Sequence, residues 1–66
     1  MDLLSFAQLR ARAMELADTA KYNHWEEIGA EMEREGHAMA TKRLGADPIL
    51  RSMLNARCAL AKDRRS

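Results

Sequence analysis

Apolar residues recur along the first third of the chain at alternating intervals of three and four. These residues are Phe6, Leu9, Ala13, Leu16 and Ala20. The spacing places them on one stripe of an α-helix. Ser5 stands three residues before Gln8, and this pair fits a capping box, in which each side chain accepts a hydrogen bond from a free backbone N–H group. The pattern predicts a helix over residues 5–21.

The chain has a break near Asn23, after which a second helix is expected. Asn23 and Glu26 have the spacing of another capping box, and glutamates in the first turn suit the positive end of the helix dipole. Leu44 followed by Gly45 ends the segment, because glycine readily adopts the left-handed conformation that closes helices. We therefore predict a helix over residues 24–44.

A row of large apolar residues beside two glycines is the most suggestive feature of this segment. It consists of Trp25, Gly29, Met32, Gly36 and Met39. A glycine costs about 1 kcal/mol in a helix relative to Ala, so either close approach of another helix or a break at Gly36 should compensate. We favour a continuous helix through Gly36. Such rows form cores or subunit interfaces, and methionine-rich surfaces also bind partner helices, so these five residues are the candidate interface.

Asp47 and Pro48 indicate the start of a third helix. Asp accepts the first free N–H groups, and Pro at the first helical position loses no hydrogen bond. We predict a helix over residues 48–62, followed by a polar tail over residues 63–66. Its apolar positions are Ile49, Leu50, Met53, Leu54, Ala56, Leu60 and Ala61.

Three helices with short connections predict an all-α fold in a single helical domain over residues 1–66. The arrangement is a three-helix bundle or a long helical hairpin with a third helix. A chain of this size buries only about 60% of its unfolded surface, which makes the core marginal. Cys58 is the single cysteine, so no disulfide can form within the chain. We therefore expect dimerisation to complete the fold.

The charge is small overall but unevenly placed. The net charge of +1 implies neither a nucleic-acid nor a membrane partner, although residues 26–35 hold five glutamates against one arginine and the rest is basic. No run approaches the roughly 18 apolar residues that cross a bilayer. Met1 is followed by Asp2 in place of the basic start of a signal peptide. We expect no membrane partner and a cytoplasmic location, in agreement with one unpaired cysteine.

Residue types that carry catalytic chemistry are present but do not form a recognisable site. His24, His37 and Cys58 have no zinc-type spacing with one another or with the carboxylates. The sequence contains neither a nucleophile elbow nor a glycine-rich phosphate loop. We therefore predict no catalytic residue, no cofactor and no metal, and do not expect an enzyme.

Two functional hypotheses remain. The first is a small non-enzymatic protein-interaction module, most simply a homodimer, and otherwise a partner of another helical protein. The alternative is a helix-turn-helix-like nucleic-acid-binding regulator, which requires the second helix to break at Gly36. Its phosphate contacts would come from Lys42, Arg43, Arg51 and Arg57. The five glutamates of residues 26–35 argue against it, because they would repel phosphate.

Overall fold

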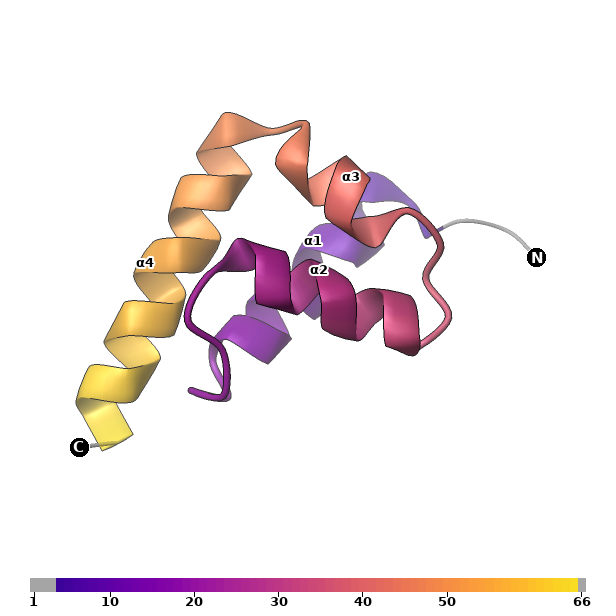
Figure 1. Cartoon of the computed structure of the whole chain (residues 1–66). Coiled ribbons are helices and arrows are strands. Elements are labelled where there is room, and N and C mark those ends of the chain that lie inside the picture. The colour runs from indigo at the N-terminus through magenta and orange to yellow at the C-terminus, as the bar shows by residue number, and fades with distance from the viewer. Residues whose placement is uncertain (1–3, 66) are drawn as a thin grey trace.

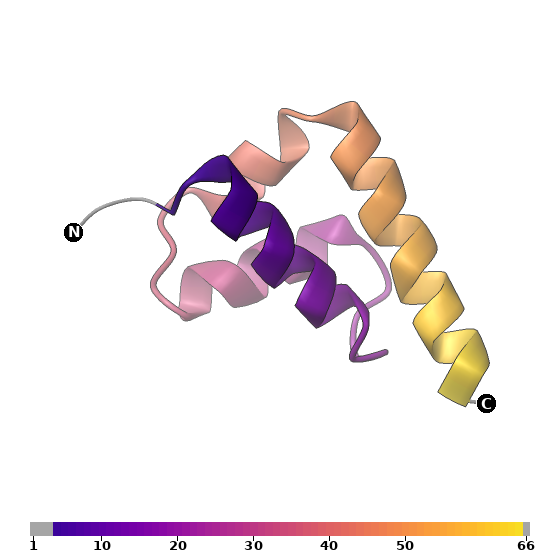
Figure 2. The ribbon, with the colours of Figure 1, turned by 180° about the vertical axis from the view of Figure 1, so that it is seen from behind.

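The computed structural model describes residues 4–65, in which four helices and no strand occur. The helices are α1 (Phe6–Ala17), α2 (Trp25–Arg34), α3 (Ala40–Gly45) and α4 (Pro48–Arg65). The helix α1 lies behind α2 in Figure 1 and in front of it in Figure 2, and α4 runs along one side of the other three. The prediction of an all-α helical bundle is confirmed, with four helices in place of three.

The start of α1 is as predicted, and its end comes earlier. The backbone N–H of Gln8 donates to the Ser5 hydroxyl at 3.2 Å, and the N–H of Ser5 donates to the Gln8 side chain at 3.0 Å. The helix ends before the predicted residue 21 because the Thr19 hydroxyl bonds the Leu16 carbonyl at 2.6 Å. Ala20 then takes a left-handed conformation with φ of 65°, which stops the helical ladder.

The predicted continuous helix over residues 24–44 is wrong, because α2 and α3 replace it. Gly36 has a φ of 99°, and its N–H donates to the Glu33 carbonyl at 3.0 Å. The N–H of His37 reaches back to the Met32 carbonyl, also at 3.0 Å. These two hydrogen bonds form a Schellman motif, which satisfies the free carbonyls of α2. Gly36 therefore breaks the helix.

The two glycines of α2 and its turn have different roles. A Cβ on Gly29 would lie 2.8 Å from the backbone Cα of Thr41, so the absence of a side chain lets α3 pack closely on α2. A Cβ on Gly36 would meet nothing within 4 Å, and its left-handed conformation is what requires glycine. The carboxylate of Glu33 also accepts the N–H of Thr41 at 3.0 Å, which ties α2 to the first turn of α3.

The predicted capping box between Asn23 and Glu26 does not form at the start of α2. The N-cap residue His24 makes no capping hydrogen bond with its side chain, and Glu27, not Glu26, accepts the N–H of Asn23 at 2.6 Å. That hydrogen bond stabilises the carboxylate and lowers the pKa of Glu27. The N–H of Trp25 donates to the side chain of Asn55 on α4 at 2.9 Å. A distant helix therefore supplies the cap that the local sequence does not.

Gly45 is the last residue of α3 and does not take the left-handed conformation that we predicted. A Cβ on Gly45 would lie 2.9 Å from the ring of Trp25. On α4, the guanidinium of Arg51 lies 5.7 Å from the centroid of the same ring. The absence of a side chain at Gly45 therefore makes room for a tryptophan that joins α2, α3 and α4.

The start of α4 follows the prediction, since the Asp47 carboxylate accepts the N–H groups of Ile49 and Leu50 at 3.0 and 3.2 Å. The helix continues to Arg65, so the segment predicted as a polar tail over residues 63–66 is helical through that residue. Ser66 lies outside the described residues. At 18 residues, α4 is the longest of the four helices.

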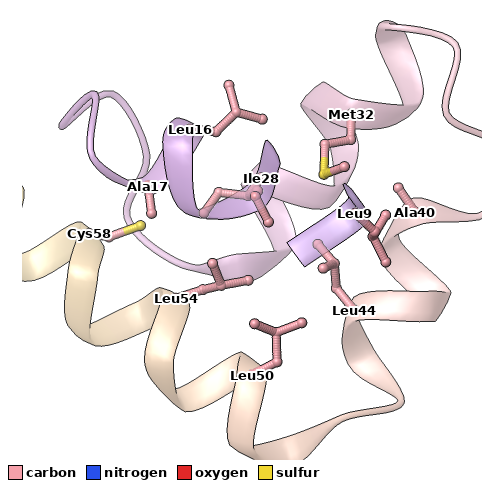
Figure 3. Close-up of a cluster of buried hydrophobic side chains, with 11 residues drawn as sticks. Leu9, Leu16, Ala17, Ile28, Met32, Ala40, Leu44, Leu50, Leu54 and Cys58 are labelled. Atoms are coloured by element: carbon pink, nitrogen blue, oxygen red, sulfur yellow. The ribbon is translucent and has the colours of Figure 1, made fainter. Parts of the chain in front are cut away.

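One cluster of buried side chains, drawn in Figure 3, joins all four helices. Every buried side chain in the described part of the chain is apolar, and no buried side-chain nitrogen or oxygen there lacks a hydrogen bond. The cluster consists of Leu9, Ala13, Leu16, Ala17, Ile28, Met32, Ala40, Leu44, Leu50, Leu54 and Cys58.

Candidate interaction surface

The structure does not place the five residues of the predicted interface on one surface. Met32 is fully buried in the core, and Gly29 is buried against α3. Trp25 is half-buried at the junction of three helices. Gly36 and Met39 lie in the turn after α2, where Met39 is 51% exposed and has a φ of 62°. The row required a continuous helix, and it ends where α2 ends.

A different apolar surface occurs on α4, which carries two stripes at helical spacing. The inner stripe faces the core and consists of Leu50, Leu54, Cys58 and Ala61, each 2% exposed or less. The outer stripe consists of Ile49, Met53, Ala56 and Leu60. Intervals of four, three and four residues align the outer stripe on a line roughly 120° around the helix from the inner one. Its two ends are open to solvent, since Ile49 is 73% exposed and Leu60 is 59% exposed.

A hollow of about 270 Å³ lies beside the C-terminal end of the outer stripe. It is lined by Leu60, Arg57 and Arg64 of α4 and by Asp18 at the end of α1. The Arg57 guanidinium donates to both carboxylate oxygens of Asp18, at 3.1 and 2.8 Å, and this contact lowers the pKa of Asp18. Within residues 4–65, Arg64 makes no ion pair of this kind, so the hollow has an excess of positive charge.

The opposite edge of the outer stripe has smaller side chains and fewer charges than the edge with the arginines. Ser52, Ala59 and Asp63 are exposed there. Ala56, the third residue of the stripe, is also small and exposed. Over its whole length, residues 48–65, α4 has five basic residues and one acidic residue in its sequence.

The acidic residues that end α1 and α2 are each paired with an arginine from another helix. Asp18 and Glu35 occupy the C-cap positions, where a negative charge opposes the helix dipole. Arg57 of α4 binds Asp18, and Arg12 of α1 binds Glu35 through two hydrogen bonds, which lower the pKa of Glu35. These pairs tie helix ends together and have a structural role.

The histidines and the cysteine lie in separate places. His24 is 3.6 Å from a Glu26 oxygen, and His37 is 3.6 Å from a Glu35 oxygen. Cys58 is fully buried, and burial raises the pKa of its thiol. A raised pKa and no exposure disfavour a nucleophilic thiolate. Across residues 4–65, no group of three His, Cys, Asp or Glu side chains is arranged to hold a metal.

The sequence contains a signal for the outer stripe that our interpretation did not separate. The sequence predicts seven apolar positions in this helix. They fall into two sets at helical spacing, one beginning at Ile49 and the other at Leu50. A helix with apolar residues over such a wide arc either is buried on two sides or has one side available for binding. Only the position of the other helices shows which set is buried.

Among the described residues, no helix is long and apolar enough to cross a membrane. The known proteins offer no guide to the role of the outer stripe. No family model matches the chain, and no curated protein and no solved structure is found to be similar to it.

Proposed function

We propose that this chain is a non-enzymatic protein-interaction module that binds through the outer stripe of α4. The observation that carries the proposal is the alignment of two widely exposed aliphatic side chains, Ile49 and Leu60, on one line of a helix whose other side completes the core. Scattered exposed apolar residues need no explanation, but an aligned set over about three turns is a surface to which another helix can pack.

The interaction role no longer depends on the residues that the sequence suggested. Met32 and Gly29 are used inside the chain, so they offer no area to a partner. Self-association stays a prediction that follows from the small size of the domain. We also propose a cytoplasmic location, which the buried, unpaired Cys58 supports.

One observation supports the nucleic-acid alternative, and two argue against it. The break at Gly36 produces the helix pair that it required. However, α3 has six residues, and the Glu33 carboxylate is bound to the N–H of Thr41 in its first turn. A recognition helix uses that end to approach the bases, and a carboxylate there repels the phosphate backbone. We therefore do not propose nucleic-acid binding.

The test compares the wild-type chain with the double variant Ile49→Gln, Leu60→Gln. Both side chains are exposed, so the variant should fold, which circular dichroism and thermal unfolding check. Light scattering across a dilution series and affinity recovery from a host extract then measure association with itself and with other proteins. The proposal expects an association that the wild type makes and the variant loses. Identical behaviour of the two folded proteins would contradict it.

A matched control is Ala11→Gln together with Ala30→Gln. Both alanines are exposed on α1 and α2, away from the outer stripe. This control introduces the same two polar side chains into the chain. Association should survive in it, because it leaves α4 unchanged.

A further inference from the structure

From the charges that border the outer stripe we infer the chemistry of its partner: an acidic amphipathic helix of a different protein. This inference rests on the proposed function, since it assigns an occupant to the same surface. The apolar side of the partner would cover the residues from Ile49 to Leu60, and its carboxylates would meet Arg57 and Arg64.

The shape of the surface suits a helix. Ile49 and Leu60 stand at the two ends of the stripe, eleven residues apart, which is about 16 Å along the helix axis. Between them Met53 is half-buried and Ser52, Ala56 and Ala59 are small and exposed, so side chains of a second helix can pack between the two large ends. A helix packs its side chains into such a groove at an interaxial distance of about 8–10 Å.

The charge of the surface determines which helix fits. Arg64 borders Leu60 and makes no ion pair among the described residues. Arg57 beside it is paired with Asp18, whose carboxylate is the single acidic group that lines the hollow. A partner carboxylate in this hollow would complete the neutralisation and form charge-assisted hydrogen bonds with the guanidinium groups. A basic partner would meet repulsion at the same place.

A second copy of the chain fits this surface less well. In an antiparallel two-fold pairing of α4 helices, identical edges meet, so the edge with Arg57 and Arg64 lies along the same basic edge of the other copy. In a parallel pairing, opposite edges meet, and the edge opposite the arginines offers them a single carboxylate, that of Asp63. The acidic helix of this chain, α2, has no free apolar side, because Ile28 and Met32 are in the core.

A membrane surface is also disfavoured by the residues on α4. Interfacial helices insert large side chains from a broad apolar face that has basic residues on both edges. Here one edge of the stripe has Arg57 and Arg64, and the opposite edge has Asp63 as its charged residue. The surface therefore suits a partner helix better than lipid.

The experiment uses two synthetic helical peptides of about 18 residues, a length that supports helix formation. Both have leucines at intervals of four, three and four. One has glutamates beside the leucines, and the other has lysines at the same positions. Their affinities for the full chain are measured by fluorescence anisotropy at low and physiological salt. We expect the glutamate peptide to bind about tenfold more tightly at low salt, with a preference that shrinks as salt is added.

Two variants and their controls test the assignment. Arg64→Glu should abolish or reverse the preference for the glutamate peptide, whereas Arg10→Glu, the same charge change on the exposed side of α1, should keep it. Leu60→Gln should weaken the binding of both peptides, whereas Ala11→Gln should leave the binding of both unchanged. Circular dichroism confirms that each variant is folded before binding is measured.

The outcomes separate this inference from the proposed function. Equal binding of the two peptides, still weakened by Leu60→Gln, would overturn the acidic partner and leave the interaction surface in place. Failure of both peptides to bind at concentrations on the order of 1 mM would overturn the helix assignment. Stronger binding to anionic phospholipid vesicles than to either peptide would assign the surface to lipid. A dimer that Leu60→Gln dissociates would assign it to a second copy.

Discussion

The two sides of α4 have similar apolar content and opposite exposure. Leu54 on the inner stripe is 0% exposed, whereas Ile49 on the outer stripe is 73% exposed, although both are aliphatic residues on the same helix. The hydrophobic pattern of α4 therefore contains two separate sets of residues. The inner stripe supplies free energy of folding, and the outer stripe leaves apolar area exposed that a partner can cover.

The largest expected difference between the two sides is in stability. Leu54→Ala should lower the free energy of unfolding by about 2–5 kcal/mol, because it removes buried methyl groups and leaves a cavity. Ile49→Ala should change it by less than about 0.5 kcal/mol. Urea unfolding followed by circular dichroism measures both. Similar losses in the two variants would show that the outer stripe is also buried, for example in a stable oligomer.

A smaller effect is expected at the start of α4, where both stripes begin. Asp47→Ala removes the carboxylate that accepts the N–H groups of Ile49 and Leu50 and should cost about 1 kcal/mol. Asp47→Asn is the matched control, since an amide oxygen caps nearly as well. Thermal unfolding of the two variants should therefore give a lower melting temperature for the alanine variant.

The pH dependence of stability tests the edge of α4 that contacts α1. The pKa of Asp18 is lowered in the folded chain by Arg57, so its stabilising contribution is full above the unfolded carboxyl pKa of about 4 and is lost as the pH falls through the folded value. The carboxylate is partly exposed, so the effect should be smaller than that of Asp47→Ala. Unfolding curves from pH 6 to pH 2.5 should show a smaller acid-induced loss in Asp18→Asn than in the wild type.

Glu15→Gln provides the comparison for that measurement. Glu15 is exposed on α1, and its closest ion-pair distance is 4.0 Å. Replacing the Glu15 carboxylate by an amide should leave the acid-induced loss of stability unchanged. Parallel curves for Asp18→Asn and the wild type would argue that the contact with Arg57 contributes nothing in solution.

The smallest effect should come from the exposed end of the outer stripe. Leu60→Gln should leave the melting temperature nearly unchanged, because the side chain is 59% exposed and lies outside the core cluster. Differential scanning calorimetry at two concentrations measures this. A fall in melting temperature that grows with concentration would instead indicate that Leu60 is covered by self-association.

Local signals in the sequence predicted the helix starts at Ser5 and Asp47, because the capping side chain and the N–H groups it binds are neighbours. The end of the second helix was also encoded locally. A continuous helix would need an apolar side chain three or four residues after Met32, and the sequence has Glu35 and Gly36 there. The prediction of a continuous helix did not include the Schellman motif, in which the N–H groups of Gly36 and His37 together satisfy two carbonyls.

Contacts between distant residues could not be predicted in the same way. The ring of Trp25 packs against Gly45. The backbone N–H of Trp25 donates to the side chain of Asn55, thirty positions away. No spacing in the sequence encodes these pairs, since they depend on the crossing of three helices. The candidate surface has the same limit. The periodicity of α4 contains both stripes, but which one is buried follows from the packing of α1, α2 and α3 against it.

The position of Trp25 gives the chain its own optical reporter. It is the single tryptophan of the sequence, and it is held by Gly45 and Arg51 at the meeting point of three helices. Arg51 follows Ile49 by two residues, so it lies about 200° around α4 from the outer stripe. Fluorescence from this indole should therefore shift when the helices separate and stay constant when a ligand occupies the far side of α4. The indole can therefore report folding in the same sample in which the anisotropy of a labelled peptide reports binding.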